Sequence, residues 1–120
     1  VLVLGTSTWG AGELQDDWYD GVNVLKKCDL SHKYVALFGC GDSDSYSDTF
    51  CDAIGIIYED LKDTHCKFCG AGDTAGYTFD SSIAVVDGKF VGLPIDEVNE
   101  DNQTEERISA WAEQVKQEIS

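Results

Sequence analysis

The stretch YVALFGCGDSDSY, residues 34–46, decides the fold that we predict for this chain. Its first half, YVALF, is a continuous apolar run, which is typical of a strand buried on both faces of a sheet. Its second half consists of glycines, small polar residues and a tyrosine, which is typical of a loop. In α/β sheets, ligands bind at the carboxyl ends of the strands, so the end of this strand is a candidate ligand site.

A second stretch of the same kind begins the chain. Residues 1–4, VLVL, form another apolar run, and the loop-like stretch GTSTWG follows at 5–10. Between the two runs, four apolar residues recur at the spacing of one helical face: Leu14, Trp18, Val22 and Leu25. The pattern predicts two parallel strands joined by a helical crossover.

Apolar spacing predicts two more helices. The first follows the second strand, with Asp48 as its N-cap and an apolar face made of Phe50, Ala53, Ile54, Ile57, Tyr58 and Leu61. The second ends the chain, with Thr104 as its N-cap and an apolar stripe made of Ile108, Trp111, Ala112, Val115 and Ile119. Alternating strands and helices over residues 1–120 indicate one α/β domain.

Residues 66–103 are less regular. CKFCGAG at 66–72 favours a short strand, and IAVVDGKFVGLPI at 83–95 is typical of a hairpin around Asp87 and Gly88. The stretch between them is rich in turn signals. We therefore expect an insertion of roughly 20 residues to interrupt the last strand of the sheet.

The chain is strongly acidic. It has 8 basic and 23 acidic residues, a net charge of −15 and a sequence pI near 4.1. Such a surface repels phosphate backbones and anionic lipid, so nucleic acids and membranes are poor candidates as partners. A basic protein partner is favoured, and the alternative is that the acidic residues only confer solubility.

Five cysteines are an odd number, which argues against a fully paired disulfide framework and favours a reducing, cytoplasmic compartment. No apolar stretch approaches the ~20 residues of a membrane span, and no signal-peptide pattern opens the chain. Cys66 and Cys69 form a C-x-x-C pattern, but residues i and i+3 of a strand face opposite sides, so a redox or metal site is the weaker interpretation. Cys40 and Cys51 are expected to pack as small apolar residues.

Three aspartates, Asp42, Asp44 and Asp48, have the spacing of a calcium loop. The pattern lacks the closing Glu that such a loop needs. We therefore predict no metal site.

Each of the two predicted strand-end loops carries one aromatic residue, Trp9 in the first and Tyr46 in the second. If the strands are neighbours, the two rings can approach with a flat gap between them, which a planar ligand would fill. Stacking gives about 0.5 to 1.5 kcal/mol per aromatic pair beyond area burial, and glycines let the backbone approach a ring edge. The alternative is that two unrelated aromatic residues plug the ends of their loops.

Three segments resemble the flavodoxins. STWGAGELQDDW at 7–18 resembles their tryptophan loop, ALFGCGDSDSYSDTFCDAI at 36–54 resembles their second flavin loop, and GKFVGLPIDEVN at 88–99 resembles the end of their long-chain class. The resemblance covers nearly all 120 residues and keeps the family's order. It implies a flavodoxin-like doubly wound parallel sheet that begins at the family's third strand, so that the N-terminal βαβ portion is absent.

The resemblance implies an FMN site with the isoalloxazine ring between Trp9 and Tyr46. The other cofactor-binding residues that it implies are Ser7, Thr8 and Gly10 on the ring and phosphate side, Cys40, Gly41 and Asp42 at the pyrimidine edge through backbone amides, and Asp48 in the Asp-x-Phe that follows the tyrosine. The carbonyl of Gly10 would turn to accept a hydrogen bond from N5 when the flavin takes one electron.

The function implied by the resemblance is that of an electron carrier, not an enzyme. It would pass single electrons between a reductase and an acceptor through short-lived complexes with basic partners. Because reduced FMN is an anion, a protein of net charge −15 disfavours it, and this lowers the second reduction potential.

One motif of the family is not found. Flavodoxins hold the FMN phosphate with a loop of the pattern T-x-T-G-x-T, and about 50 residues of the usual doubly wound fold would precede Val1. We expect the chain to be the carboxyl-terminal part of a longer protein or half of an assembly, and to bind FMN weakly or not at all by itself. The alternatives are a flavin-free assembly module and the FMN domain of a larger reductase.

Overall fold

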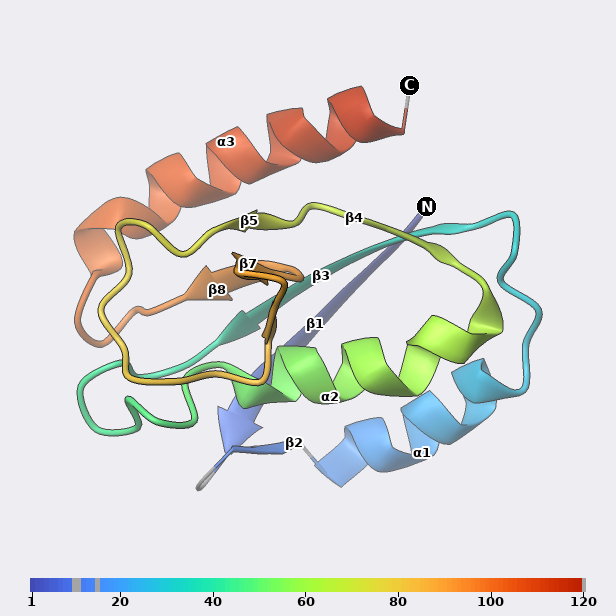
Figure 1. Cartoon of the computed structure of the whole chain (residues 1–120), viewed down its shortest axis with the longest axis horizontal. Coiled ribbons are helices and arrows are strands. Elements are labelled where there is room, and N and C mark those ends of the chain that lie inside the picture. The colour runs from blue at the N-terminus through green and yellow to red at the C-terminus, as the bar shows by residue number, and fades with distance from the viewer. Residues whose placement is uncertain (10–11, 15, 120) are drawn as a thin grey trace.

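The computed structural model describes residues 1–9, 12–14 and 16–119 as a three-layer α/β fold (Figure 1). A mainly parallel sheet forms the middle layer, with α1 and α2 on one face and α3 on the other. The strands of this sheet are β1 (Leu2–Trp9), β2 (Glu13–Leu14), β3 (Tyr34–Cys40), β4 (Lys67–Cys69) and β8 (Leu93–Ile95). The helices are α1 (Asp16–Lys26), α2 (Asp52–Leu61), the short 3-10 helix η1 (Lys62–Thr64) and α3 (Asp101–Glu118). A smaller antiparallel sheet contains β5 (Gly72–Asp73), β6 (Val85–Val86) and β7 (Lys89–Phe90).

The predicted parallel pair is confirmed. β1 and β3 run side by side from the pair Leu2 and Val35 to the pair Ser7 and Cys40. The α1 crossover covers one face of this pair, with Val22 buried against the core. Leu14 is buried as predicted, but it lies in β2 and not in the helix.

The predicted interruption of the last strand is also confirmed. β4 pairs with the first half of β3 and β8 pairs with its second half, both in parallel. The chain leaves the sheet between them for residues 70–92, and the predicted hairpin lies there with its turn at Asp87 and Gly88. These two residues have φ values of 54° and 80°, the left-handed conformation that a tight hairpin turn requires.

Both predicted N-caps are wrong. α2 begins at Asp52, so Asp48 lies four residues before the helix, and the Thr8 hydroxyl of β1 accepts the amide of Ala53 at 3.1 Å in its place. α3 begins at Asp101, so Thr104 lies inside the helix, where its hydroxyl has no hydrogen-bond partner among the described residues. A turn made by the Glu100 amide and the Asp96 carbonyl, 2.9 Å apart, leads into this helix.

The predicted apolar face is confirmed for α2 and is largely wrong for α3. Five of the six residues predicted for α2 are buried, and Tyr58 is half-buried against the same core. In α3 only Val115 is buried, Trp111 and Ile119 are partly buried, and Ile108 remains 43% exposed. Ile108 and Trp111 line an apolar pocket together with Phe38, Leu93 and Ile95 of the sheet.

The two cysteines of the C-x-x-C pattern lie on opposite faces of the sheet, as strand alternation predicts. Cys66 packs against the larger core on the α2 side, and its thiol is directed at the Leu61 carbonyl. Cys69 belongs to the smaller cluster under α3. Cys51 is buried, which confirms its predicted packing role, whereas Cys40 is exposed, so that prediction is wrong for Cys40.

The insertion is attached to the core by aromatic rings. Tyr77, Phe79 and Phe90 surround Phe50, and the ring centroids of Phe50 and Phe79 are 5.6 Å apart. The Tyr77 hydroxyl donates to the Pro94 carbonyl at 2.8 Å, and burial raises the pKa of Tyr77 to about 12. The sequence predicts turns in this segment, but its rings complete the core.

None of the described helices is long and apolar enough to cross a membrane.

Candidate functional site

Three parallel strands end side by side at one edge of the sheet. Ser7 of β1 is paired with Cys40 of β3, and Cys40 is paired in turn with Ile95 of β8. The segment 41–46 leaves β3 at this point, where Figure 1 shows the arrowheads of β1 and β3 on the same side of the molecule. Loops from separate parts of the chain therefore meet at the edge where α/β sheets bind ligands.

The segment 41–46 forms a compact turn. The Gly41 amide donates to the Ile95 carbonyl at 2.9 Å and thereby extends the pairing of β3 with β8. The Asp42 carboxylate accepts the amides of Asp44 and Ser45 at 3.1 and 3.0 Å, and the Tyr46 amide closes the turn on the Asp42 carbonyl at 2.9 Å. Tyr46 remains 45% exposed, so its ring is accessible at this edge.

A buried carboxylate lies under this turn. Asp96, directly after β8, is 0% exposed and accepts the Ser43 amide at 3.1 Å and the Ser43 hydroxyl. It also accepts the Asn99 amide at 3.0 Å and the Asn99 side-chain amide at 3.1 Å. The same Asn99 side chain donates to the Asp42 carboxylate at 2.8 Å. Asp96 and Asn99 thus join the residues after β8 to the turn after β3.

Hydrogen bonding keeps both carboxylates ionised. The amide of Ser45 and then the side chain of Asn99 lower the pKa of Asp42. Burial works to raise the pKa of Asp96, but the donors on Ser43 and Asn99 outweigh it and hold this pKa below its ordinary value. Burial and the nearby Glu97 carboxylate raise the pKa of the exposed Cys40 thiol, so this thiol stays protonated at neutral pH.

The structure brings only part of the predicted site together. Ser7 is paired with Cys40 in the sheet, and Gly41, Asp42 and Tyr46 follow directly in the turn. The Thr8 hydroxyl is occupied by α2, as described above. Asp48 is exposed, and its carbonyl accepts the Ser81 hydroxyl of the insertion at 2.7 Å.

The predicted ring contacts from the first loop involve Trp9 and Gly10. The side chain of Trp9 and the whole of Gly10 lie outside the described residues, although the Trp9 backbone is paired with Glu13. Sequence reasoning did not select Ser43, Asp96 or Asn99. The only signal was an aspartate placed directly after the apolar run LPI, where a buried strand ends.

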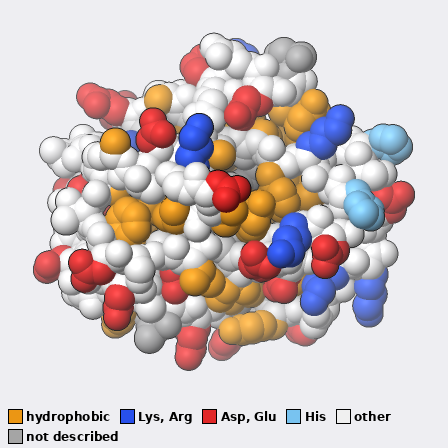
Figure 2. All heavy atoms as spheres, viewed as in Figure 1, with side chains coloured by type: hydrophobic (Ala, Val, Ile, Leu, Met, Phe, Trp, Pro, Cys, Tyr) orange, Lys and Arg blue, Asp and Glu red, His pale blue; other side chains and the backbone are white. Residues whose placement is uncertain are grey.

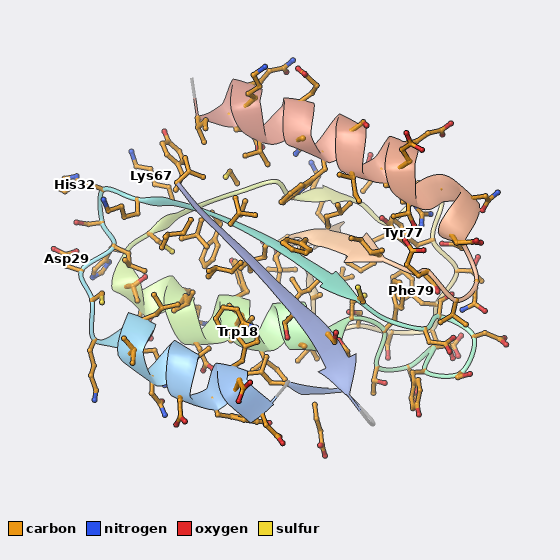
Figure 3. The ribbon with its side chains drawn as sticks, turned by 180° about the vertical axis from the view of Figure 1, so that it is seen from behind. Trp18, Asp29, His32, Lys67, Tyr77 and Phe79 are labelled. Carbon is orange, nitrogen blue, oxygen red and sulfur yellow. The ribbon has the colours of Figure 1, made fainter. Side chains whose placement is uncertain are left out.

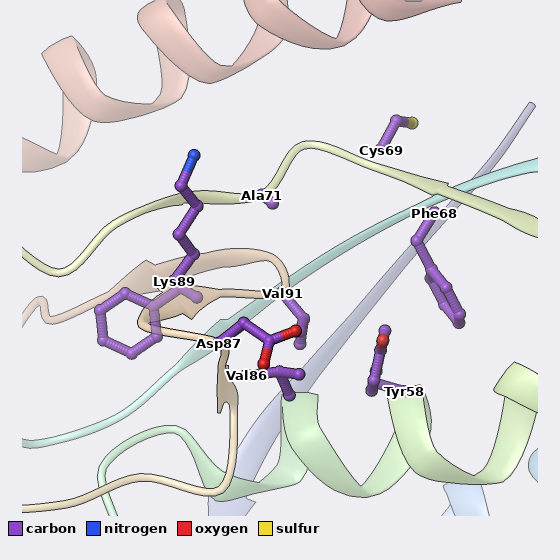
Figure 4. Close-up of a pocket in the computed structure, with 9 residues that line it drawn as sticks. Tyr58, Phe68, Cys69, Ala71, Val86, Asp87, Lys89 and Val91 are labelled. Atoms are coloured by element: carbon purple, nitrogen blue, oxygen red, sulfur yellow. The ribbon is translucent and has the colours of Figure 1, made fainter.

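A separate cavity of about 220 Å³ lies between β4, the hairpin and α2 (Figure 4). Its lining includes the rings of Tyr58 and Phe68, whose centroids are 4.5 Å apart. Asp87 and Lys89 of the hairpin also line it. Among the predicted site residues that the structure describes, none lines this cavity, so we do not assign the candidate site to it.

Charge is distributed unevenly over the molecule. Five of the eight Lys and Arg residues lie where α1 and α2 end and β3 and β4 begin, and they are Lys26, Lys27, Lys33, Lys62 and Lys67. Figure 3 shows His32, Asp29 and Lys67 at this end and Tyr77 and Phe79 at the other. Figure 2 shows both histidines and most of the basic side chains toward the right, while the left end is acidic. The candidate site therefore lies at the acidic end.

A doubly wound α/β sheet with an accessible tyrosine and carboxylates at its strand ends defines a class, the α/β proteins that bind a cofactor at the carboxyl edge of the sheet. Within this class, the chain belongs to the flavodoxin family, because the flavodoxin family model matches residues 1–111. Members of this family are electron carriers, not enzymes, and their cofactor is FMN.

Individual proteins that are similar to this chain support the same family. Over 120 residues the chain is 44% identical to Flavodoxin 1 of Azotobacter vinelandii, which covers 98% of this chain and 69% of that protein. It is 50% identical to the flavodoxin of Helicobacter pylori over 115 residues, 96% of this chain and 69% of the relative. The crystal structure of Fusobacterium nucleatum flavodoxin bound to flavin mononucleotide is similar with a TM-score of 0.93 at 32% identity, covering 98% of this chain and 70% of that one.

Proposed function

We propose that this chain carries single electrons on FMN, with the isoalloxazine ring at the ends of β1, β3 and β8 and between Trp9 and Tyr46. The observation that carries the proposal is the accessible Tyr46 ring at the end of β3, held by a turn whose shape is set from β8. The similarity to an FMN-bound flavodoxin supports the same position. When bound, FMN supplies one-electron chemistry that no side chain offers.

The residues around this position fit a planar ring with few charges. Ser7 and Cys40 present small side chains, Gly41 adds none, and Asp42 places a carboxylate at the rim. The Gly41 amide is bound to Ile95, and a Cβ atom on Gly41 would lie 2.7 Å from the Cys51 sulfur, so Gly41 would serve by letting the turn pack closely on the core. Thr8 would act by fixing the start of α2, and Gly10 and Asp48 would lie near the ring.

The interrupted last strand supports assignment to the long-chain class. β4 and β8 lie in line along β3, with residues 70–92 inserted between them. The family's phosphate-binding pattern does not occur within the 120 residues. We therefore propose that this chain supplies the half of the site that binds the ring and that the phosphate is held by residues outside the present sequence.

The partners that fit are basic proteins. The candidate site lies at the acidic end of a molecule with a net charge of −15, which attracts a basic surface and steers it toward the ring.

The five cysteines are all free, which supports a reducing compartment, the cytoplasm.

One observation supports a second candidate, the assembly module. β3 pairs with one edge of β1. On the other edge of β1, β2 pairs only with Thr8 and Trp9. In the described part of the chain no strand covers the other edge of Leu2–Ser7, and Val1 and Val3 are 59% and 53% exposed. An uncovered edge with apolar side chains takes up a further strand readily.

A flavin titration tests the proposal and separates the two candidates. FMN and riboflavin are added to the 120-residue chain, and the quenching of flavin fluorescence is recorded. We expect both flavins to bind weakly, with Kd values within about threefold of each other, because the proposed contacts are to the ring and the phosphate adds little. Tyr46→Ala is expected to weaken both by about tenfold, which corresponds to the loss of one stacking face.

Tyr19→Phe is the control, since Tyr19 is 51% exposed on α1 and lies outside the proposed site. It should leave both Kd values unchanged. A chain that quenches neither flavin would contradict the proposal and favour the assembly module. Equal affinities for Tyr46→Ala and the unaltered chain would remove Tyr46 from the site.

A further inference from the structure

Asp96 has an environment that is unusual for a charged side chain. Its carboxylate is 0% exposed, yet no cation contacts it within the described residues, because the salt bridges of that part of the chain involve other acids. A buried charge without a counterion is costly unless hydrogen bonds replace its hydration. Donors from Ser43 and Asn99 do so, two backbone amides and two side chains.

These donors come from two segments that are far apart in the sequence. Ser43 belongs to the turn after β3 and lies 53 residues before Asp96, whereas Asn99 lies three residues after it. The carboxylate therefore ties the turn of residues 41–46 to the end of β8. Ser43 lies between Gly41 and Tyr46, so its position sets where the Tyr46 ring stands relative to the end of β3.

We propose that Asp96 is a positioning residue of the flavin site, one that does not touch the flavin but fixes the turn that presents Gly41, Asp42 and Tyr46 to it. This inference rests on the proposed function, because it assigns a role in the same site. Asn99 extends the effect, since its side chain bridges the Asp96 and Asp42 carboxylates.

The carboxylate form is needed for this role. In Asp96→Asn an NH₂ group replaces one of the two carboxylate oxygens. This group is itself a donor, so it cannot accept the hydrogen bonds that Ser43 or Asn99 donates to that oxygen. At least one buried donor then loses its acceptor, which is the most disruptive way to break such a network. Ser43→Ala is milder, because the backbone amide of residue 43 still donates to Asp96.

The first measurement is amide hydrogen exchange by NMR on the full 120-residue chain. We expect Asp96→Asn to speed exchange of the Ser43 and Tyr46 amides by about tenfold or more, while amides in the middle of α2 change by less than about twofold. Ser43→Ala should give a smaller change of the same sign. The double variant should resemble Asp96→Asn alone, because both changes break one connection.

Asp29→Asn is the matched control. Asp29 is an exposed carboxylate that accepts the Ser31 amide two residues ahead at 3.0 Å, as Asp96 accepts the Asn99 amide three residues ahead, but it lies at the opposite end of the sheet. This variant should leave exchange in residues 43–46 unchanged. Equal exchange of Ser43 and Tyr46 in Asp96→Asn and the unaltered chain would overturn the proposal, and so would a uniform acceleration throughout the chain, which indicates a global loss of stability.

The second measurement is the flavin titration on the same variants. We expect Asp96→Asn to raise the Kd for riboflavin by about tenfold and Asp29→Asn to leave it unchanged. Faster exchange in the turn without any change in Kd would overturn the role in the flavin site. If the unaltered chain binds no flavin, the proposed function fails and this role fails with it, while hydrogen exchange still decides whether Asp96 sets the turn.

Discussion

Replacing Phe90 with alanine is expected to lower the free energy of unfolding by about 3–5 kcal/mol, the usual range for emptying a buried aromatic site. Phe90 is 0% exposed, and its ring lies 5.1 Å from that of Tyr77 and 5.2 Å from that of Phe79. These rings connect the insertion to Phe50, which lies two residues before α2, and so a cavity at residue 90 loosens the insertion and the core together. Urea denaturation followed by tryptophan fluorescence measures the change.

Val86→Ala is the control for this prediction. Val86 lies in β6 of the same hairpin and is paired with Lys89, but its side chain is only half-buried. Its loss should cost less than about 1 kcal/mol. If Phe90→Ala costs no more than Val86→Ala, the insertion does not share the core and this account of it is wrong.

Gly55→Ala is expected to lower the free energy of unfolding by about 1–3 kcal/mol, although alanine is the better helix former. A Cβ atom on Gly55 would lie 2.6 Å from the carbonyl carbon and oxygen of Ile83 and 2.8 Å from the Ala84 nitrogen. These are backbone atoms of the segment leading into the hairpin, and they cannot move aside as the end of a side chain can. The helix and the insertion would have to separate.

Gly21→Ala is the matched control, since it makes the same change in the middle of α1. There a Cβ atom would lie 3.3 Å from the Trp18 ring, which is a side chain and can shift. Because alanine favours the helix by about 1 kcal/mol over glycine, this variant should be neutral or more stable. Thermal unfolding of both variants gives the comparison, and an equal loss in the two would contradict the close contact at Gly55.

The sheet could be predicted from the sequence because its signals are local. The apolar runs at 1–4 and 34–38 became β1 and β3, which pair in parallel. Burial follows the prediction in β3 and not in β1, where Val3 is 53% exposed. The hairpin turn is signalled by Asp87 and the glycine that follows it, and α2 is signalled by the spacing of its apolar residues. Both signals lie within a few neighbouring residues. Such patterns survive because burial and turn geometry select the residue type at each position.

The helix starts could not be predicted, because they are set by contacts across the fold. The hydroxyl that caps α2 comes from Thr8, 45 residues before Ala53. With that amide satisfied, the chain is free to bury Phe50 before the helix begins, and Asp48 is not needed as a cap. At α3, the turn around Asp96 and Asn99 starts the helix four residues earlier than the threonine signal indicates.

Only the residues of the candidate site that directly follow a predicted strand can be predicted from the sequence, because the others are set by contacts across the fold. Tyr46, Gly41 and Asp42 follow an apolar run directly and could be selected from sequence. Asp96 and Asn99 lie in an acidic stretch that looks like solvated surface, and only the folded chain shows one of them to be buried under the turn.

The most direct test of the central claim, that a flavin lies at the end of β3, is protection of Cys40 from alkylation. Cys40 and Cys28 are both free and exposed, and Cys28 lies beyond the end of α1 near the amino ends of the strands, so each molecule carries its own control. The chain is treated with iodoacetamide with and without FMN, and modification at each cysteine is followed by mass spectrometry. We expect FMN to slow modification of Cys40 by about fivefold or more and to leave Cys28 unchanged. Equal rates at Cys40 with and without bound flavin, or equal slowing at both cysteines, would contradict it.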